Sequence, residues 1–99
     1  MRLTPDEITA IKACVARHFG AGATVRLFGS RVHDHLRGGD IDLQVIAESP
    51  ERAHWHHESD FRRDLEDMIG ERRVDILLLA PGEPFRPIDH IAFNEGVVL

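Results

Sequence analysis

One stretch of the sequence, LFGSRVHDHLRGGDIDL at positions 27–43, limits the possible folds more than any other. An apolar run ends at Gly29, a polar loop follows, and a second apolar run begins with Asp40 and Asp42. Residues two apart on a strand face the same side, so these two carboxylates would project together while the apolar residues around them face a core. The stretch therefore predicts two strands joined by a loop, with acids at one end.

The remaining pattern predicts the order helix, strand, strand, helix, strand, helix. Thr4, Pro5 and Glu7 are typical of a helix start with a capping box. The run RRVDILLLA is apolar on both faces, as in a central strand. We therefore expect an α/β fold, a small mixed sheet flanked by helices, in one domain over residues 1–99. The predicted helices cover residues 4–20, 49 to about 69, and 87–95, and the predicted strands cover 24–28, 40–47 and 72–80.

Apolar residues repeat with the helical period on each predicted helix, which marks the face expected to pack on the core. Trp55 lies off the second of these stripes, so it is either a flank of the core or an exposed contact for a partner. The three stripes are Ile8, Ile11, Val15 and Phe19, then Phe61, Leu65 and Met68, and finally Ile88, Ile91 and Ala92.

Composition limits the classes of function. The net charge of -5 argues against broad nucleic-acid binding, which needs many cations to neutralise phosphates. The single cysteine, Cys14, excludes an internal disulfide and suits a reducing compartment. No apolar run approaches the roughly 18 residues that span a bilayer, and no signal-peptide core is found. We therefore expect a cytoplasmic protein without a membrane anchor.

A third acid, Asp75, lies inside the apolar run VDILLL, where an unpaired carboxylate is costly to bury. If its strand lies beside the one that carries Asp40 and Asp42, the three acids would form one cluster. Such oxygen ligands suit Mg²⁺, which uses one or two carboxylates together with substrate phosphates. The cluster could hold two metal ions about 3.5 to 4 Å apart, an arrangement used for in-line displacement at phosphorus.

The turn at Gly29 and Ser30 would supply a complementary anion site. Glycine permits a tight turn and a close approach of the backbone to a ligand. Successive backbone N–H groups and the Ser30 hydroxyl could bind phosphate oxygens, and Arg31 could add a charged contact. Ser30 could also cap a helix, which does not exclude phosphate binding.

Simpler explanations exist for the acids. Asp40 and Asp42 could be solvated residues that serve the turn before the strand. Asp75 could be an acid on an edge strand, paired with Arg72 or Arg73. The coincidence of all three acids with the Gly29 turn favours the metal site over these alternatives.

The segment GSRVHDHLRGGDIDL resembles the signature of the minimal nucleotidyltransferases, the smallest members of the polymerase-β-like superfamily. Their pattern is Gly-Ser, a spacer, Asp-x-Asp, and a further Asp on a later strand. The ending IDHIAFNEGVVL is also similar to the tails of these proteins. The resemblance implies the polymerase-β-like nucleotidyltransferase fold.

The resemblance also implies roles for residues. Gly29 and Ser30 would bind the nucleoside triphosphate. Asp40 and Asp42 would bind two Mg²⁺ ions. Asp75 would lie near the acceptor hydroxyl and help to activate it, as general base or as a further metal ligand.

The implied reaction transfers AMP from ATP and releases pyrophosphate. Larger members of the superfamily carry a second domain for the acceptor, and no residues remain here to build one, so the acceptor site would be shared with another protein. Many minimal nucleotidyltransferases are antitoxins paired with a helical HEPN-domain ribonuclease toxin, which some inactivate by adding AMP to a tyrosine. We therefore expect an antitoxin of this kind in a hetero-oligomer. The alternatives are a non-catalytic module that occludes the toxin, and a subunit of a small-molecule nucleotidyltransferase.

Overall fold

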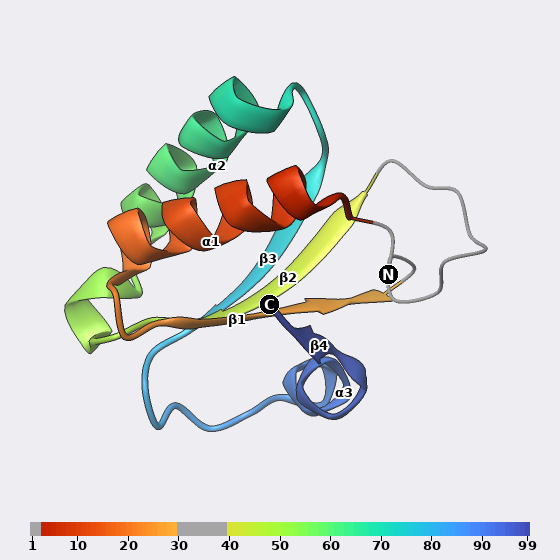
Figure 1. Ribbon diagram of the computed structural model, residues 1–99. Helices are drawn as coiled ribbons and strands as arrows, with labels where there is room; N and C mark the ends of the chain where they lie inside the picture. Colours follow the sequence, from red (N-terminus) through yellow and green to blue (C-terminus); the bar gives the residue numbers. More distant parts are fainter. Residues whose placement is uncertain (1–2, 30–39) are drawn as a thin grey trace.

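The computed structural model describes residues 3–29 and 40–99. Within them the chain forms an α+β fold with three α-helices and one four-stranded mixed sheet, as expected from the sequence (Figure 1). In chain order the elements are α1 (Pro5–Phe19), β1 (Thr24–Phe28), β2 (Ile41–Ile46), the 3₁₀ turn η2 (Pro50–Arg52), α2 (Trp55–Ile69), β3 (Val74–Leu79), α3 (Pro87–Glu95) and β4 (Val97–Val98).

The sheet has the strand order β3-β2-β1-β4. β1 is antiparallel to both β2 and β4, whereas β3 is parallel to β2 and follows it through α2. Helices α1 and α2 cover one face of the sheet, and α3 lies on the opposite face against β1 and β2 (Figure 1). The end of β1 therefore lies beside the beginning of β2, where the acids cluster.

Helix α1 begins as the sequence predicts. The Thr4 side chain accepts a hydrogen bond from the Glu7 N–H at 3.1 Å, and the Glu7 carboxylate accepts one from the Thr4 N–H at 2.9 Å. Pro5 occupies the first turn, and Gly20 ends the helix at a φ of 104°. Such a cap stabilises a helix by about 1 kcal/mol, because it satisfies N–H groups that have no partner within the helix.

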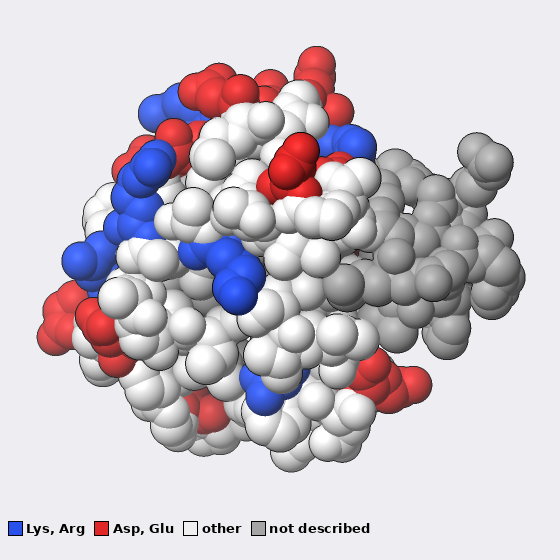
Figure 2. Space-filling view, in the orientation of Figure 1, with Lys and Arg blue, Asp and Glu red and all other residues white. Residues whose placement is uncertain are grey.

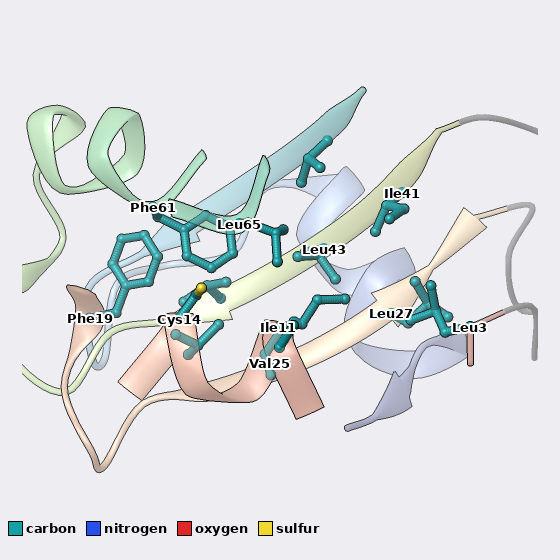
Figure 3. Packing of buried hydrophobic residues seen from close by; sticks show 14 of the residues in the cluster. Leu3, Ile11, Cys14, Phe19, Val25, Leu27, Ile41, Leu43, Phe61 and Leu65 are labelled. Atoms are coloured by element: carbon teal, nitrogen blue, oxygen red, sulfur yellow. The ribbon is translucent and has the colours of Figure 1, made fainter. Parts of the chain in front are cut away.

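The core lies between α1, α2 and one face of the sheet (Figure 3). The rings of Phe19 and Phe61, from the two helices, lie 5.3 Å apart. Alternate residues of β2 contribute to this core, and Ile41 and Leu43 are fully buried in it. Burial of each such side chain contributes about 1.5 to 3 kcal/mol. The intervening residue, Asp42, must therefore face the layer that contains α3.

The prediction of one continuous helix from residue 49 to about 69 is wrong. The chain forms η2, becomes extended at His54 (φ -119°, ψ 145°), and then begins α2 at Trp55. The ring Nδ1 of His54 accepts a hydrogen bond from the His56 N–H at 3.3 Å. His54 is thus an N-cap, and a cap requires a non-helical backbone at that position.

The prediction that the third strand is central is also wrong, because β3 forms an edge of the described sheet and pairs only with β2. Val74 and Ile76 pack against the core beneath α1 and α2, while Leu79 is buried outside that cluster. Layers above and below the strand, rather than strands on both sides, explain why its sequence is apolar on both faces.

Three apolar residues expected inside are exposed: Met68 on α2 (50%), and Ile88 (42%) and Ile91 (50%) on α3. Helix α3 buries Ala92, as expected, and in place of the two isoleucines it buries Asp89. Trp55 is 72% exposed and is therefore not a flank of the core.

Polar contacts explain the rotation of α3. The Asp89 carboxylate accepts hydrogen bonds from the Arg86 backbone N–H at 2.8 Å and from its guanidinium at 3.0 Å. The Gln44 side-chain amide donates to the Asp89 carbonyl at 2.9 Å. These contacts turn Asp89 toward the sheet and the isoleucines outward.

None of the helices in residues 3–29 and 40–99 is both long and apolar enough to cross a membrane.

Candidate nucleotidyl-transfer site

Two acids lie side by side where β2 and β3 begin. The parallel register of these strands sets Asp42 directly opposite Asp75. On the other side of β2, the antiparallel register sets Phe28 opposite Asp42. Paired residues share a face of the sheet, so Phe28, Asp42 and Asp75 form one row on the face that α3 partly covers. Asp40 lies two residues before Asp42 and is exposed.

The carboxylates interact electrostatically. The pKa of Asp42 is raised, first because the group is partly buried and then because the negative charges of Asp75 and Asp40 lie nearby. A hydrogen bond between the side chains of Asp42 and Asp75 acts in the same direction, and the charge of Arg73 opposes it. The charges of Asp75 and Asp40 therefore make the ionised form of Asp42 less favourable.

Asp75 also has a cationic neighbour. Its carboxylate lies 3.7 Å from the Arg73 guanidinium, and half of the Asp75 side chain is exposed. An exposed pair of this kind contributes only about 0 to 1 kcal/mol. The sequence offered two explanations for Asp75, an edge-strand acid paired with an arginine or a member of the acid cluster. Asp75 fits both, since it lies on an edge strand beside Arg73 and also lies beside Asp42.

Gly29 brings the end of β1 against the Asp42 carboxylate. Its φ is 76°, in the region that favours glycine. A Cβ atom added at Gly29 would overlap Asp42 Oδ2. Only a residue without a side chain can occupy this position while the carboxylate stays in place. The other two residues expected to bind the nucleotide, Ser30 and Arg31, lie outside the described residues.

The geometry and the donor type of the acids determine whether they can hold a metal ion. In residues 3–29 and 40–99, no group of three or more His, Cys, Asp or Glu side chains is assembled closely enough to hold a metal ion. The adjacent carboxylates of Asp42 and Asp75 nevertheless form a pair of hard oxygen donors on neighbouring strands. Mg²⁺ commonly uses one or two carboxylates and completes its coordination with phosphates and water, so this donor set fits it.

Gln44, for which the sequence predicted no role, is the next residue on this face of β2. It is buried and its amide donates to the carbonyl of Asp89 on α3. Its Oε1 atom is buried without a hydrogen bond to any described residue. The signal in the sequence is an amide within the apolar run of β2. Gln44 links α3 to the strand that carries Asp42.

Comparison with protein families gives one informative match. The model of a family described as "Nucleotidyltransferase domain" matches residues 8–95, which extend from α1 to the end of α3. The match includes Asp40, Asp42 and Asp75. Comparison with curated proteins gives no match.

Proposed function

The chain belongs to the nucleotidyltransferase domain family, and from this premise we propose that it transfers AMP from ATP to a hydroxyl group on a partner protein. Domains of this family generally use a nucleoside triphosphate and a divalent metal ion. The choice of AMP, of a protein acceptor and of Mg²⁺ is our proposal.

The register between β2 and β3 carries the proposal. It aligns Asp42 with Asp75 at the end of the sheet where Gly29 closes against Asp42. Two like charges held side by side on rigid strands are unfavourable unless a cation lies between them. The pair is therefore better explained by ligand binding than by stability.

Each residue has a distinct part in the proposed site. Asp42 and Asp75, with Asp40 close by, would hold Mg²⁺. The bound metal would neutralise the charge of the triphosphate and of the departing pyrophosphate. Gly29 lets the backbone approach the site, and its position at the end of β1 suits contact with the phosphates.

In the proposed reaction, the acceptor hydroxyl oxygen forms a bond to the α-phosphorus of ATP. The bond from that phosphorus to the bridging oxygen breaks, and pyrophosphate leaves. The hydroxyl proton passes to Asp75, whose carboxylate is half exposed and lies on the outer strand, where an acceptor can reach it. Catalysis then depends on orientation and on the stabilisation of charge.

The proposed partner is a HEPN-domain toxin, with a tyrosine as acceptor, so that the protein acts as an antitoxin in a hetero-oligomer. This choice comes from the resemblance of the GSRVHDHLRGGDIDL segment to minimal nucleotidyltransferases.

An exposed apolar surface supports the presence of some protein partner, because large exposed apolar patches mark interaction sites. Figure 2 shows that charged side chains concentrate over α1 and α2, and few interrupt the surface around β4. The exposed apolar residues of this region are Ile88, Ile91, Phe93, Val97 and Val98.

A second candidate is a binding module that neutralises the toxin by occlusion without catalysis. The ion pair between Arg73 and Asp75 favours it. It differs from the first candidate in one measurable respect, since the partner would be bound but not modified.

Intact-mass spectrometry of the partner, incubated with this protein, ATP and Mg²⁺, separates the two candidates. We expect a mass gain of one or more AMP groups on the partner. The gain should disappear in Asp42→Asn and Asp75→Asn variants and persist in Glu51→Gln, a matched change of an exposed acid in η2. A stable complex with no mass gain would support occlusion and refute transfer.

A further inference from the structure

Strand β3 forms one edge of the sheet, and every second residue of this strand directs its backbone N–H and C=O groups away from β2. The Ile41 N–H donates to the Arg73 carbonyl and the Ala47 N–H to the Leu79 carbonyl, both at 2.9 Å. Odd-numbered residues of β3 therefore direct their backbone groups to β2. Because strand residues alternate, Ile76 and Leu78 direct their N–H and C=O groups outward.

The outer edge is covered only at its beginning by described side chains. There the Arg62 guanidinium donates to the outward carbonyl of Val74. No strand of the described sheet pairs with this side of β3. An uncovered edge with apolar residues is a template for pairing with another polypeptide.

The row of paired residues that contains the acids ends at this edge. It runs from Phe28 through Asp42 to Asp75. A further strand would lie about 4.8 Å beyond β3, and its residue opposite Asp75 would face the same side as Asp75. A hydroxyl side chain at that position would lie beside Asp75 on the side away from Asp42.

A groove lies at the same edge, between the end of α2 and the beginning of β3. Its volume is about 270 Å³, and its lining includes the apolar side chains of Leu65 and Ile69, the three arginines Arg62, Arg72 and Arg73, and the two acids Glu66 and Asp75. Residues that flank the hydroxyl residue on an added strand would point into this groove. Its apolar wall suits an aliphatic stem, and its three arginines outnumber its two acids, so the groove can take a side chain with a terminal carboxylate, as in glutamate.

We propose that the acceptor is an extended polypeptide segment that pairs with the outer edge of β3, with its hydroxyl residue opposite Asp75 and a glutamate next to it in the groove. The assignment of a hydroxyl acceptor rests on the proposed function. A peptide fits the edge because its backbone supplies N–H and C=O groups at the spacing of a strand. The net charge of -5 disfavours a nucleic acid in the same place.

The test uses a short synthetic peptide with tyrosine flanked by glutamate and by valine and threonine residues. Its binding to the full chain is measured by fluorescence anisotropy without nucleotide, and AMP transfer is then measured with ATP and Mg²⁺. A second peptide carries N-methyl groups at alternate positions, which remove the N–H groups that would face β3. We expect it to bind about tenfold more weakly, because two hydrogen bonds at about 0.5 to 1.5 kcal/mol each are lost. A third peptide with glutamine in place of glutamate should bind about two- to fivefold more weakly.

A matched pair of variants tests the protein side. Ile76→Pro removes an outward N–H without removing a bond to β2, since proline is tolerated in an edge strand with its nitrogen outward. Ile76→Val keeps the N–H and serves as control. We expect Ile76→Pro to lose peptide binding about tenfold while ATP binding is unchanged. Circular dichroism shows whether Ile76→Pro is folded. If it is not, the comparison of the parent and methylated peptides on the wild-type protein still tests edge pairing.

The outcomes separate this inference from the proposed function. Equal binding of the parent and methylated peptides, or no binding of either, would overturn edge pairing, and so would equal binding by the folded Ile76→Pro and Ile76→Val variants. Peptide binding at the edge without any AMP transfer would instead contradict the proposed function and leave the edge site standing.

Discussion

The close approach of Gly29 to Asp42 leads to a quantitative prediction for Gly29→Ala. The new methyl group would overlap Asp42 Oδ2, and the backbone would keep a φ of 76° that side chains rarely adopt. The variant should therefore lose stability for two separate reasons, and it should displace the carboxylate that we assign to metal binding.

The structure allows the two costs to be estimated. Placing a residue other than glycine in the left-handed region costs about 1 to 2 kcal/mol, and a less flexible unfolded chain returns about 0.4 to 1 kcal/mol of this. Overpacking against Asp42 costs about 1 to 3 kcal/mol more. We therefore expect a total loss of about 1 to 5 kcal/mol for Gly29→Ala. Each kcal/mol lowers Tm by about 4 to 8 °C in a domain of this size.

Gly82 provides a matched control. It has the same φ of 76°, but an added Cβ would meet no atom within 4 Å. Gly82→Ala should therefore show only the backbone cost, about 1 kcal/mol or less. The difference between the two variants isolates the contact of Gly29 with Asp42.

The assays are denaturant unfolding followed by circular dichroism, and calorimetric titration of ATP with Mg²⁺. Gly29→Ala should weaken ATP binding, and Gly82→Ala should not. In the double variant Gly29→Ala, Asp42→Ala the overlap disappears, because the Asp42 Cβ atom is 3.5 Å from the added methyl carbon. We expect a coupling of about 1 to 3 kcal/mol in the double-mutant cycle. Equal losses for Gly29→Ala and Gly82→Ala, with no coupling to Asp42, would refute the reasoning.

Two further predictions concern pH. Because the folded state raises the pKa of Asp42, its ionised form costs stability above that raised pKa, and the cost is absent below the unfolded value of about 3.8. Asp42→Asn should therefore raise Tm at pH 7 and lose this advantage near pH 3.5, and an unchanged Tm at pH 7 would contradict the repulsion from Asp75. Asp64 behaves oppositely, since hydrogen bonds from His18 at 2.7 Å and Arg17 at 2.6 Å lower its pKa. Asp64→Asn should lower Tm at pH 7, and the difference in Tm between the variant and the wild type should shrink as the pH falls through the lowered pKa of Asp64. A difference in Tm that stays constant down to pH 2 would count against the pairing of Asp64 with His18 and Arg17.

Turn residues and capping residues in the sequence predicted those element bounds that depend on neighbouring residues. The bounds of β1 and α3 agree with the structure because Gly and Pro residues punctuate the chain there, and the capping box set the start of α1. The break before α2 was missed because a histidine is an uncommon cap. The edge position of β3 and the rotation of α3 depend on contacts between distant residues, such as Gln44 with Asp89.

The predictions about the candidate site divide in the same way, into those that depend on neighbouring residues and those that depend on distant ones. The alternation that turns Asp42 away from the core side of Ile41 and Leu43 is a local property of a strand. The position of Asp75 depends on the order and register of strands, which periodicity does not specify, and the structure places it opposite Asp42. Its assignment as a third ligand or base remains a prediction, as do those of Ser30 and Arg31.

The parallel pairing of β2 with β3 has a consequence for the kinetics of folding. β1 and β2 are successive strands in the chain, whereas the whole of α2 lies between β2 and β3. Contacts between distant parts of a chain form slowly because closing the intervening loop costs entropy. Asp42 and Asp75 therefore meet in this late step, and we expect their repulsion to slow it. Refolding should accordingly be faster in Asp42→Asn than in the wild type.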